Sequence, residues 1–147
     1  MTTSDEVVFK EKIWPSLGMY LATLLIIPAM TVLIMPFSRS NGIFIGIALY
    51  LLIIATFTFT APKVVLTKHT LSAGRGHIER QFLGSAVALD RIAYRQEIGR
   101  KLDARAFLAM SGWAKTGIKV EVVDPTDPTP YWIISTRKPA ELVKALA

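Results

Sequence analysis

The sequence contains no cysteine, which limits the chemistry that the chain can perform. Without cysteine there is no disulfide framework, no thiolate nucleophile and no cysteine-based metal site. The two histidines, His69 and His77, are isolated residues near the ends of predicted β-hairpins. We therefore expect neither a bound metal nor another cofactor, and the redox compartment stays undetermined.

Two long stretches lack charged residues. Residues 17 to 35 and 42 to 61 contain no Asp, Glu, Lys, Arg or His over 19 and 20 positions. Helices of about 20 apolar residues cross the hydrocarbon core of a bilayer, which is roughly 30 Å thick. We predict a transmembrane helical hairpin over residues 14 to 61, with helices at 14 to 35 and 42 to 61. Ion and proton pathways usually need charged groups inside the membrane, so a transporter or channel is not expected.

Charge is distributed unevenly along the chain. Lysine and arginine number 17 against 11 acidic residues, and residues 62 to 147 alone hold 14 basic and 8 acidic side chains. Basic residues flank both outer ends of the hairpin, whereas only Arg39 lies between the spans. Because cytoplasmic flanks are rich in lysine and arginine, we expect a two-span plasma-membrane protein with both termini cytoplasmic. The N-terminal segment, residues 1 to 13, has mixed charges, and we expect no cleaved signal peptide.

Residues 62 to 147 show the alternation of apolar and polar residues that is typical of β-strands. We count about seven short strands, including one that crosses Asp90 with a bulge and one over residues 104 to 109, and then a helix that begins at Pro139. The predicted fold class is α+β, a transmembrane hairpin followed by a small antiparallel β domain. This element order resembles a pleckstrin-homology-like (PH-like) barrel. A generic open antiparallel sheet crossed by one helix is the alternative.

Small residues in the two spans are candidates for helix packing. Gly42 and Gly46 form a GxxxG pair, and Gly18 and Ala22 form a similar pair in the first span. Glycine is also common in membrane helices generally, which is the simpler interpretation. Pro28 removes a helical hydrogen bond and predicts a bend in the first span.

No motif in the sequence predicts catalysis. Asp124 and Asp127 each precede a proline, which is typical of turns. The glycines around Arg75 lack the remaining residues of a phosphate-binding loop, and the serines have no triad signature. Asp103 and Arg105 are expected to form a salt bridge. We expect no enzyme, no catalytic or cofactor-binding residue, and no nucleic-acid binding, because the arginines come without interleaved aromatic residues.

Three stretches resemble a known family. They are residues 99 to 108, Gly112-Trp113, and residues 124 to 139 with the sequence DPTDPTPYWIISTRKP. The last is similar to a motif, DPxDPTPYW followed by (I/L)-(I/V)-STR-x-P, of an actinobacterial family of small membrane proteins known only as a domain of unknown function. Those proteins also begin with a two-helix hairpin after a Trp-Pro pair, here Trp14-Pro15. The resemblance implies an actinobacterial plasma-membrane protein and transfers no functional residue.

Two hypotheses for the function remain. In the first, the protein is an accessory or scaffolding subunit, whose hairpin packs against membrane partners or a second copy and whose β domain docks a protein. In the second, the β domain senses anionic lipids, with headgroup candidates Lys63, Lys68, Arg75 and Arg80. Solubility and membrane topology alone also explain the excess of positive charge.

Overall fold

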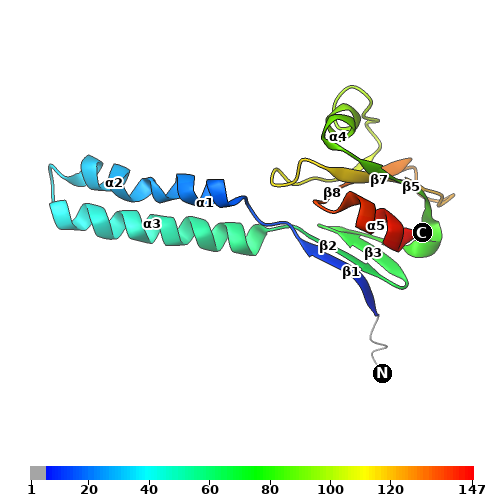
Figure 1. Ribbon diagram of the computed structural model, residues 1–147, viewed down its shortest axis with the longest axis horizontal. Helices are drawn as coiled ribbons and strands as arrows, with labels where there is room; N and C mark the ends of the chain where they lie inside the picture. The colour runs from blue at the N-terminus through cyan, green and yellow to red at the C-terminus, as the bar shows by residue number, and fades with distance from the viewer. Residues whose placement is uncertain (1–5) are drawn as a thin grey trace. The chain divides into compact units, whose positions relative to one another are not determined.

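The computed structural model describes residues 6–147 (Figure 1). The chain divides into two compact units. One is the hairpin Trp14–Ala61, and in the other the residues up to Ile13 join Pro62–Ala147. Residues 1 to 5 of the expected N-terminal segment lie outside the described residues.

The hairpin contains three helical segments. They are α1 (Leu17–Leu24), α2 (Ile26–Ile34) and α3 (Arg39–Thr60). The first span is interrupted at Leu25, one turn before Pro28. Because Pro28 has no N–H to bond the carbonyl of Leu24, the regular hydrogen bonding of the helix stops there. The interruption agrees with the hydrogen bond that Pro28 removes, and the predicted bend itself stays a prediction.

Gly42 and Gly46 lie where α3 approaches α2. Both are buried. A Cβ atom built on Gly42 would lie 2.8 Å from the Cα of Thr31, and one built on Gly46 would lie 2.8 Å from the Cα of Ile27. These distances are shorter than a carbon–carbon contact allows, so only glycine permits this approach of the two backbones. The pair therefore serves packing inside the hairpin itself.

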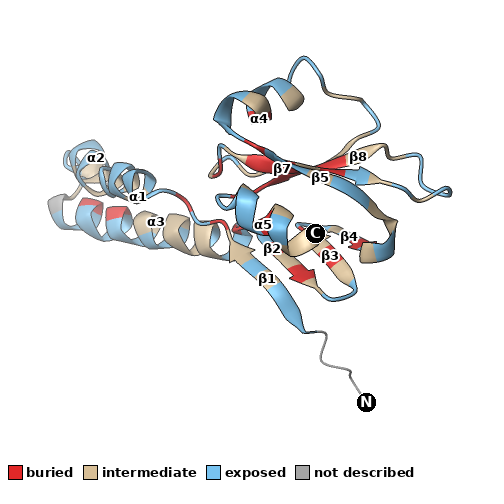
Figure 2. Ribbon diagram, turned by 45° about the vertical axis from the view of Figure 1, so that its right-hand side comes forward, coloured by how far each residue is buried: buried red, intermediate tan, exposed pale blue. Residues whose placement is uncertain are grey.

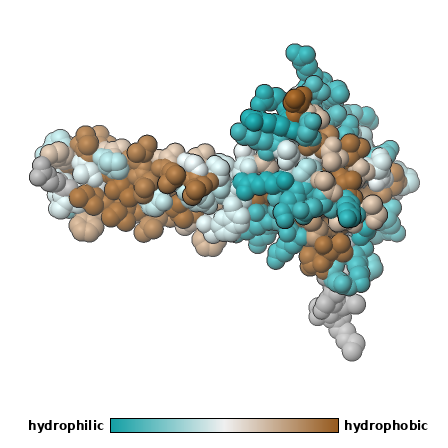
Figure 3. All heavy atoms as spheres, viewed as in Figure 1, coloured by the Kyte–Doolittle hydropathy of each residue, from teal (hydrophilic) through white to brown (hydrophobic). Residues whose placement is uncertain are grey.

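Two stretches of the described chain are long and apolar enough to cross a membrane. They are Leu17–Ile34, with 18 residues, and Ser40–Thr60, with 21. No residue of the first is buried, and apolar residues cover much of the visible surface of the hairpin (Figure 3). A core helix of a soluble protein would instead bury its apolar side chains against other elements.

The first sheet has the strand order β1-β2-β3-β4. Its strands are β1 (Val7–Lys12), β2 (Lys63–Thr67), β3 (Thr70–Ala73) and β4 (Gly76–Glu79). β1 precedes the hairpin and β2 follows it, and the two pair antiparallel with Lys12 opposite Lys63. The expected separate segment of residues 1 to 13 is thus, from Val7 onward, a strand of the β unit. Its residues Val7, Val8 and Phe9 have high β propensity.

The second sheet has the order β5-β7-β8-β6, with β6 parallel to β8 and the other pairs antiparallel. Its strands are β5 (Leu83–Leu89), β6 (Phe107–Ala109), β7 (Gly117–Val122) and β8 (Tyr131–Ser135). The helices of this unit are α4 (Arg91–Glu97), α5 (Pro139–Leu146) and a 3-10 turn, η1 (Arg80–Phe82). From residue 62 onward the structure has seven strands, as predicted.

The predicted barrel is not closed. The described strands form two separate four-stranded sheets, and none is hydrogen-bonded to both. The ladder stops at η1, which leads the chain from β4 into β5 without strand pairing. The predicted α+β class with antiparallel sheets is confirmed, whereas closure into a barrel is wrong for the described residues.

The predicted strand that crosses Asp90 is partly wrong, because the observed strand β5 ends at Leu89. Oδ1 of Asp90 accepts hydrogen bonds from the N–H groups of Ile92 and Ala93 at 3.0 and 2.8 Å, which caps α4. The residue that looks like a bulge is therefore a helix N-cap. The strand predicted over residues 104 to 109 is limited to β6.

A buried apolar cluster joins both sheets and α5 (Figure 2). Leu66 and Leu71 from the first sheet, Ile118 and Ile134 from the second, and Leu142 from α5 are completely buried. Fully burying a side chain of this size contributes about 1.5–3 kcal/mol relative to exposure. The terminal helix α5 thus contributes to the core through Leu142.

A second, smaller cluster lies under α4. It contains Leu89, Tyr94 and Ile133. Successive residues of a strand point to opposite faces, so Ile133 faces α4 while Trp132 and Ile134 face the main core. Strand β8 is consequently buried on both faces.

We predict that Gly46→Leu destabilises the hairpin, because the new side chain must push α3 away from the backbone of α2. The free energy of unfolding in mixed dodecyl sulfate micelles should fall by about 1–3 kcal/mol. Gly18→Leu is the matched control, since a Cβ atom there would meet only Oγ of Ser16 at 4.0 Å. Its effect should stay within about 0.5 kcal/mol. Equal effects of the two substitutions would contradict this account.

Candidate functional site

The four predicted headgroup residues separate into two pairs. Lys63 and Arg75 line one surface hollow of ≈ 270 Å³, together with Ile13 and Pro62. Lys63 begins β2, and Arg75 lies in the turn between β3 and β4, where Gly74 has a φ of 60°. Both side chains are exposed, and neither has an ion pair within residues 6–147. This pair is free to meet an anion.

The other two headgroup candidates have partners within the chain. Lys68 forms an ion pair with Glu6. Nη2 of Arg80 donates to the carbonyl oxygens of Ala145 and Leu146 at 2.8 and 3.2 Å. A guanidinium at the C-terminal end of α5 satisfies carbonyls that the helix leaves unpaired and interacts favourably with the helix dipole. Arg80 therefore has a structural role in holding α5.

The predicted helix-packing residues differ between the spans. Gly42 and Gly46 contact the backbone of α2, as described above. Gly18 and Ala22 are exposed on α1. Only the first pair is used in packing within the hairpin.

Asp124 and Asp127 act as turn residues. Oδ1 of Asp124 accepts the N–H of Thr126 at 2.8 Å, and Oδ1 of Asp127 accepts that of Thr129 at 2.9 Å. Hydrogen bonds from Thr129 lower the pKa of Asp127 below its ordinary value, because they favour the ionised carboxylate. Both carboxylates thus accept hydrogen bonds within their own turns, as expected.

The remaining polar candidates also have local partners. Nη2 of Arg105 lies 3.1 Å from Oδ2 of Asp103, and this side-chain hydrogen bond lowers the pKa of Asp103. Nδ1 of His77 lies 3.1 Å from Oγ of Ser72. The described residues contain no group of three or more His, Asp or Glu that could hold a metal ion.

Two buried hydroxyl residues at the end of β8 connect several elements. Ser135 and Thr136 are completely buried. Oγ of Ser135 accepts the N–H of Ser111 at 2.8 Å and is also hydrogen-bonded to the hydroxyl of Tyr94. The hydroxyl of Thr136 donates to the carboxylate of Glu11 on β1. These bonds connect β8 to α4, to β1 and to the loop that follows β6.

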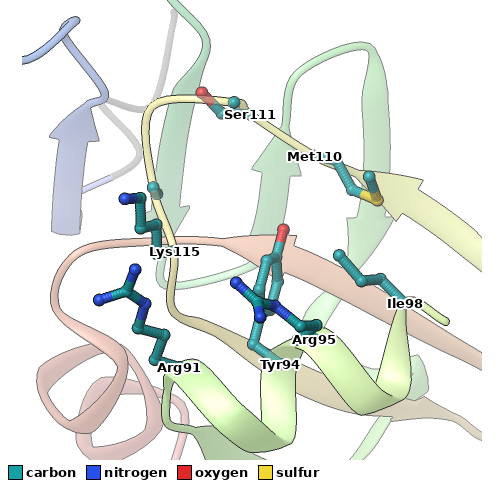
Figure 4. Close-up of a pocket in the computed structure, with 9 residues that line it drawn as sticks. Arg91, Tyr94, Arg95, Ile98, Met110, Ser111 and Lys115 are labelled. Carbon is teal, nitrogen blue, oxygen red and sulfur yellow. The ribbon is translucent and has the colours of Figure 1, made fainter.

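A cavity of ≈ 250 Å³ lies beside this network (Figure 4). Side chains of α4 project toward the loop after β6 and line the cavity with it. The labelled ones are Arg91, Tyr94, Arg95, Ile98, Met110, Ser111 and Lys115. Three of the lining residues are cations and none is acidic.

This cavity is not among the sites expected from the sequence. Arg91 and Arg95 are four residues apart, a spacing that places both side chains on one face of a helix. Because the sequence predicts a strand and not a helix over this segment, it does not predict that the two arginines share a helix face. Recognition of Asp90 as an N-cap would reveal it, whereas nothing in the sequence indicates that Lys115 joins the pair.

The fold and these sites define a small α+β protein with two long apolar stretches and two sheets whose strand pairs are antiparallel except β6–β8. The family model described as "Protein of unknown function (DUF3093)" matches residues 8–146, and the chain belongs to this family. Comparison with curated proteins and with solved structures finds no match. The expectation of a family of unknown function is confirmed.

We predict that Ser135→Ala destabilises the β unit, because it leaves the hydroxyl of Tyr94 and the N–H of Ser111 without their buried partner. The loss should be about 1–3 kcal/mol, measured by urea denaturation of the full chain in detergent. Ser85→Ala is the control, since Ser85 is exposed and bonds only Glu121 at 3.1 Å. Its cost should stay within about 0.5 kcal/mol. A Ser135→Ala variant as stable as Ser85→Ala would refute the role assigned to the network.

Proposed function

We propose that this chain is a two-span integral protein of the plasma membrane with both termini in the cytoplasm. The lengths of Leu17–Ile34 and Ser40–Thr60 and the lack of buried residues in the first support insertion into lipid. The basic residues that flank the outer ends of the hairpin support the orientation. An actinobacterial source is the setting implied by the resemblance.

The proposed topology predicts which positions a membrane-impermeant maleimide labels. The chain has no cysteine of its own, so each variant carries a single thiol. Ser38→Cys, in the connection between the spans, should react in intact cells. Gln96→Cys, which is exposed on α4, should react only after the cells are opened. The opposite pattern would overturn the orientation, and labelling of both in intact cells would overturn the proposed placement of the β unit.

We liken the β unit to an open form of the PH-like barrel. Three features support the comparison: a meander of four strands, a second sheet, and a terminal helix whose Leu142 packs against residues of both sheets. The parallel strand β6 and the unpaired turn η1 are departures from a closed barrel.

The function that we propose for this unit is binding of anionic lipid headgroups at the membrane surface. The observation that carries it is the shared hollow of Lys63 and Arg75. Lys63 follows the last hairpin residue, Ala61, by two positions, so the chain can separate their Cα atoms by at most about 7 Å. Near an anionic leaflet each such cation contributes roughly 1 kcal/mol of attraction.

The accessory or scaffolding role is the second candidate. Gly42 and Gly46 are used inside the hairpin, so they no longer argue for an external partner. Gly18 and Ala22 are exposed on α1 and leave room for a membrane partner or a second copy. Both candidates are binding roles, and neither assigns a catalytic residue.

Native mass spectrometry of the full chain with added phosphatidylglycerol tests the lipid proposal. Wild type should retain more phosphatidylglycerol than phosphatidylcholine. Lys63→Gln with Arg75→Gln should weaken that retention by roughly 1 kcal/mol per charge removed. Arg100→Gln with Lys144→Gln is the control, since it removes the same charge at exposed positions outside the hollow. Equal losses in the two double variants would show that only net charge matters.

A further inference from the structure

The cavity beside α4 gathers positive charge that the protein does not neutralise. Arg91, Arg95 and Lys115 line it, and none of the three has an ion pair in the part of the chain that the structure describes. The acidic residues at the two ends of α4 are engaged elsewhere. Asp90 caps the helix, and Glu97 binds Lys119 with 3.0 Å between Nζ and Oε2. All three side chains are exposed, so water and salt screen part of their mutual repulsion, and an anion bound between them would relieve the rest.

The wall of the cavity is held in place by buried hydrogen bonds. Tyr94 is 5 % exposed, and its hydroxyl is bonded to Ser135. The loop opposite α4 is fixed to the same oxygen through the N–H of Ser111 at 2.8 Å. Because both sides of the cavity share one anchor, its shape exists before a ligand arrives, which lowers the ordering cost of binding.

The chemistry of the lining defines the class of ligand. Two arginines can each present a pair of N–H groups to phosphate oxygens, and a lysine adds a third charge. Ile98 and Met110 supply apolar surface next to these cations. A volume of ≈ 250 Å³ is below the roughly 300–1,000 Å³ of pockets for drug-sized ligands and suits a smaller molecule.

We propose that this cavity binds a phosphate monoester that carries a compact apolar group, through Arg91, Arg95 and Lys115. The phosphate belongs either to a soluble metabolite or to a lipid headgroup. This site and the hollow of Lys63 and Arg75 share Met110 but no charged residue, so charge substitutions test the two proposals separately.

The test uses the full chain in detergent and two probes, with circular dichroism as a check of folding. In the first arm, calorimetry measures binding of phenyl phosphate, with inorganic phosphate for comparison. In the second arm, native mass spectrometry measures retention of phosphatidic acid. Arg91→Gln and Arg95→Gln should each weaken binding about tenfold or more, the scale of one charge-assisted hydrogen bond. Arg95→Lys should lose less, because it keeps the charge without the paired donors.

The control is Arg100→Gln, which removes an exposed charge outside this cavity and should change the affinity less than twofold. Binding that depends on Arg91 and Arg95 in either arm supports the proposal, and the arm in which it occurs identifies the source of the phosphate. Absence of binding in both arms, or equal affinity of wild type and Arg95→Gln, overturns it. Lys63→Gln with Arg75→Gln should leave phenyl phosphate binding unchanged, which separates this result from the lipid proposal.

Discussion

The β unit depends on the pair of buried hydroxyl residues at the end of β8. Oγ of Ser135 is hydrogen-bonded to Tyr94 and Ser111. The hydroxyl of the adjacent Thr136 donates instead to Glu11. A buried hydroxyl without a partner costs about 1–3 kcal/mol. Helix α4, the loop after β6 and strand β1 must therefore all be in place for this end of β8 to be satisfied, which makes their positions interdependent.

The same constraint connects the β unit to the ends of the hairpin. Glu11 lies on β1, and the N–H of Ile13 donates to the carbonyl of Pro62 at 3.0 Å, immediately after the β1–β2 ladder. The hairpin is therefore an insertion between two neighbouring strands of one sheet. Lys63 begins the second of these strands, so a positive charge lies just after the point where the chain leaves the hairpin.

Local chemistry explains which parts of the fold the sequence predicts. Pro28 lacks an N–H wherever it lies, and Asp124 and Asp127 bond their own neighbours, so the helix interruption and the turns follow from single residues. Asp90 also acts locally, yet its capping role is hard to predict because apolar residues continue to alternate beyond the preceding strand. Arg80 cannot be assigned in this way, since its partners at the end of α5 are 65 or more residues away.

Period and composition are properties of neighbouring residues, so the two apolar spans, the number of strands after Pro62 and the terminal helix could be predicted from the sequence. Tertiary packing was needed to show that residues 7 to 12 complete a sheet, that the sheets stay open, and that Gly42 and Gly46 pack against α2. It also brings the cations together, since Arg91 and Arg95 lie near Lys115 only when α4 packs beside the loop after β6. Each of these outcomes joins residues far apart in the chain, and long-range pairing depends on packing that no local pattern records.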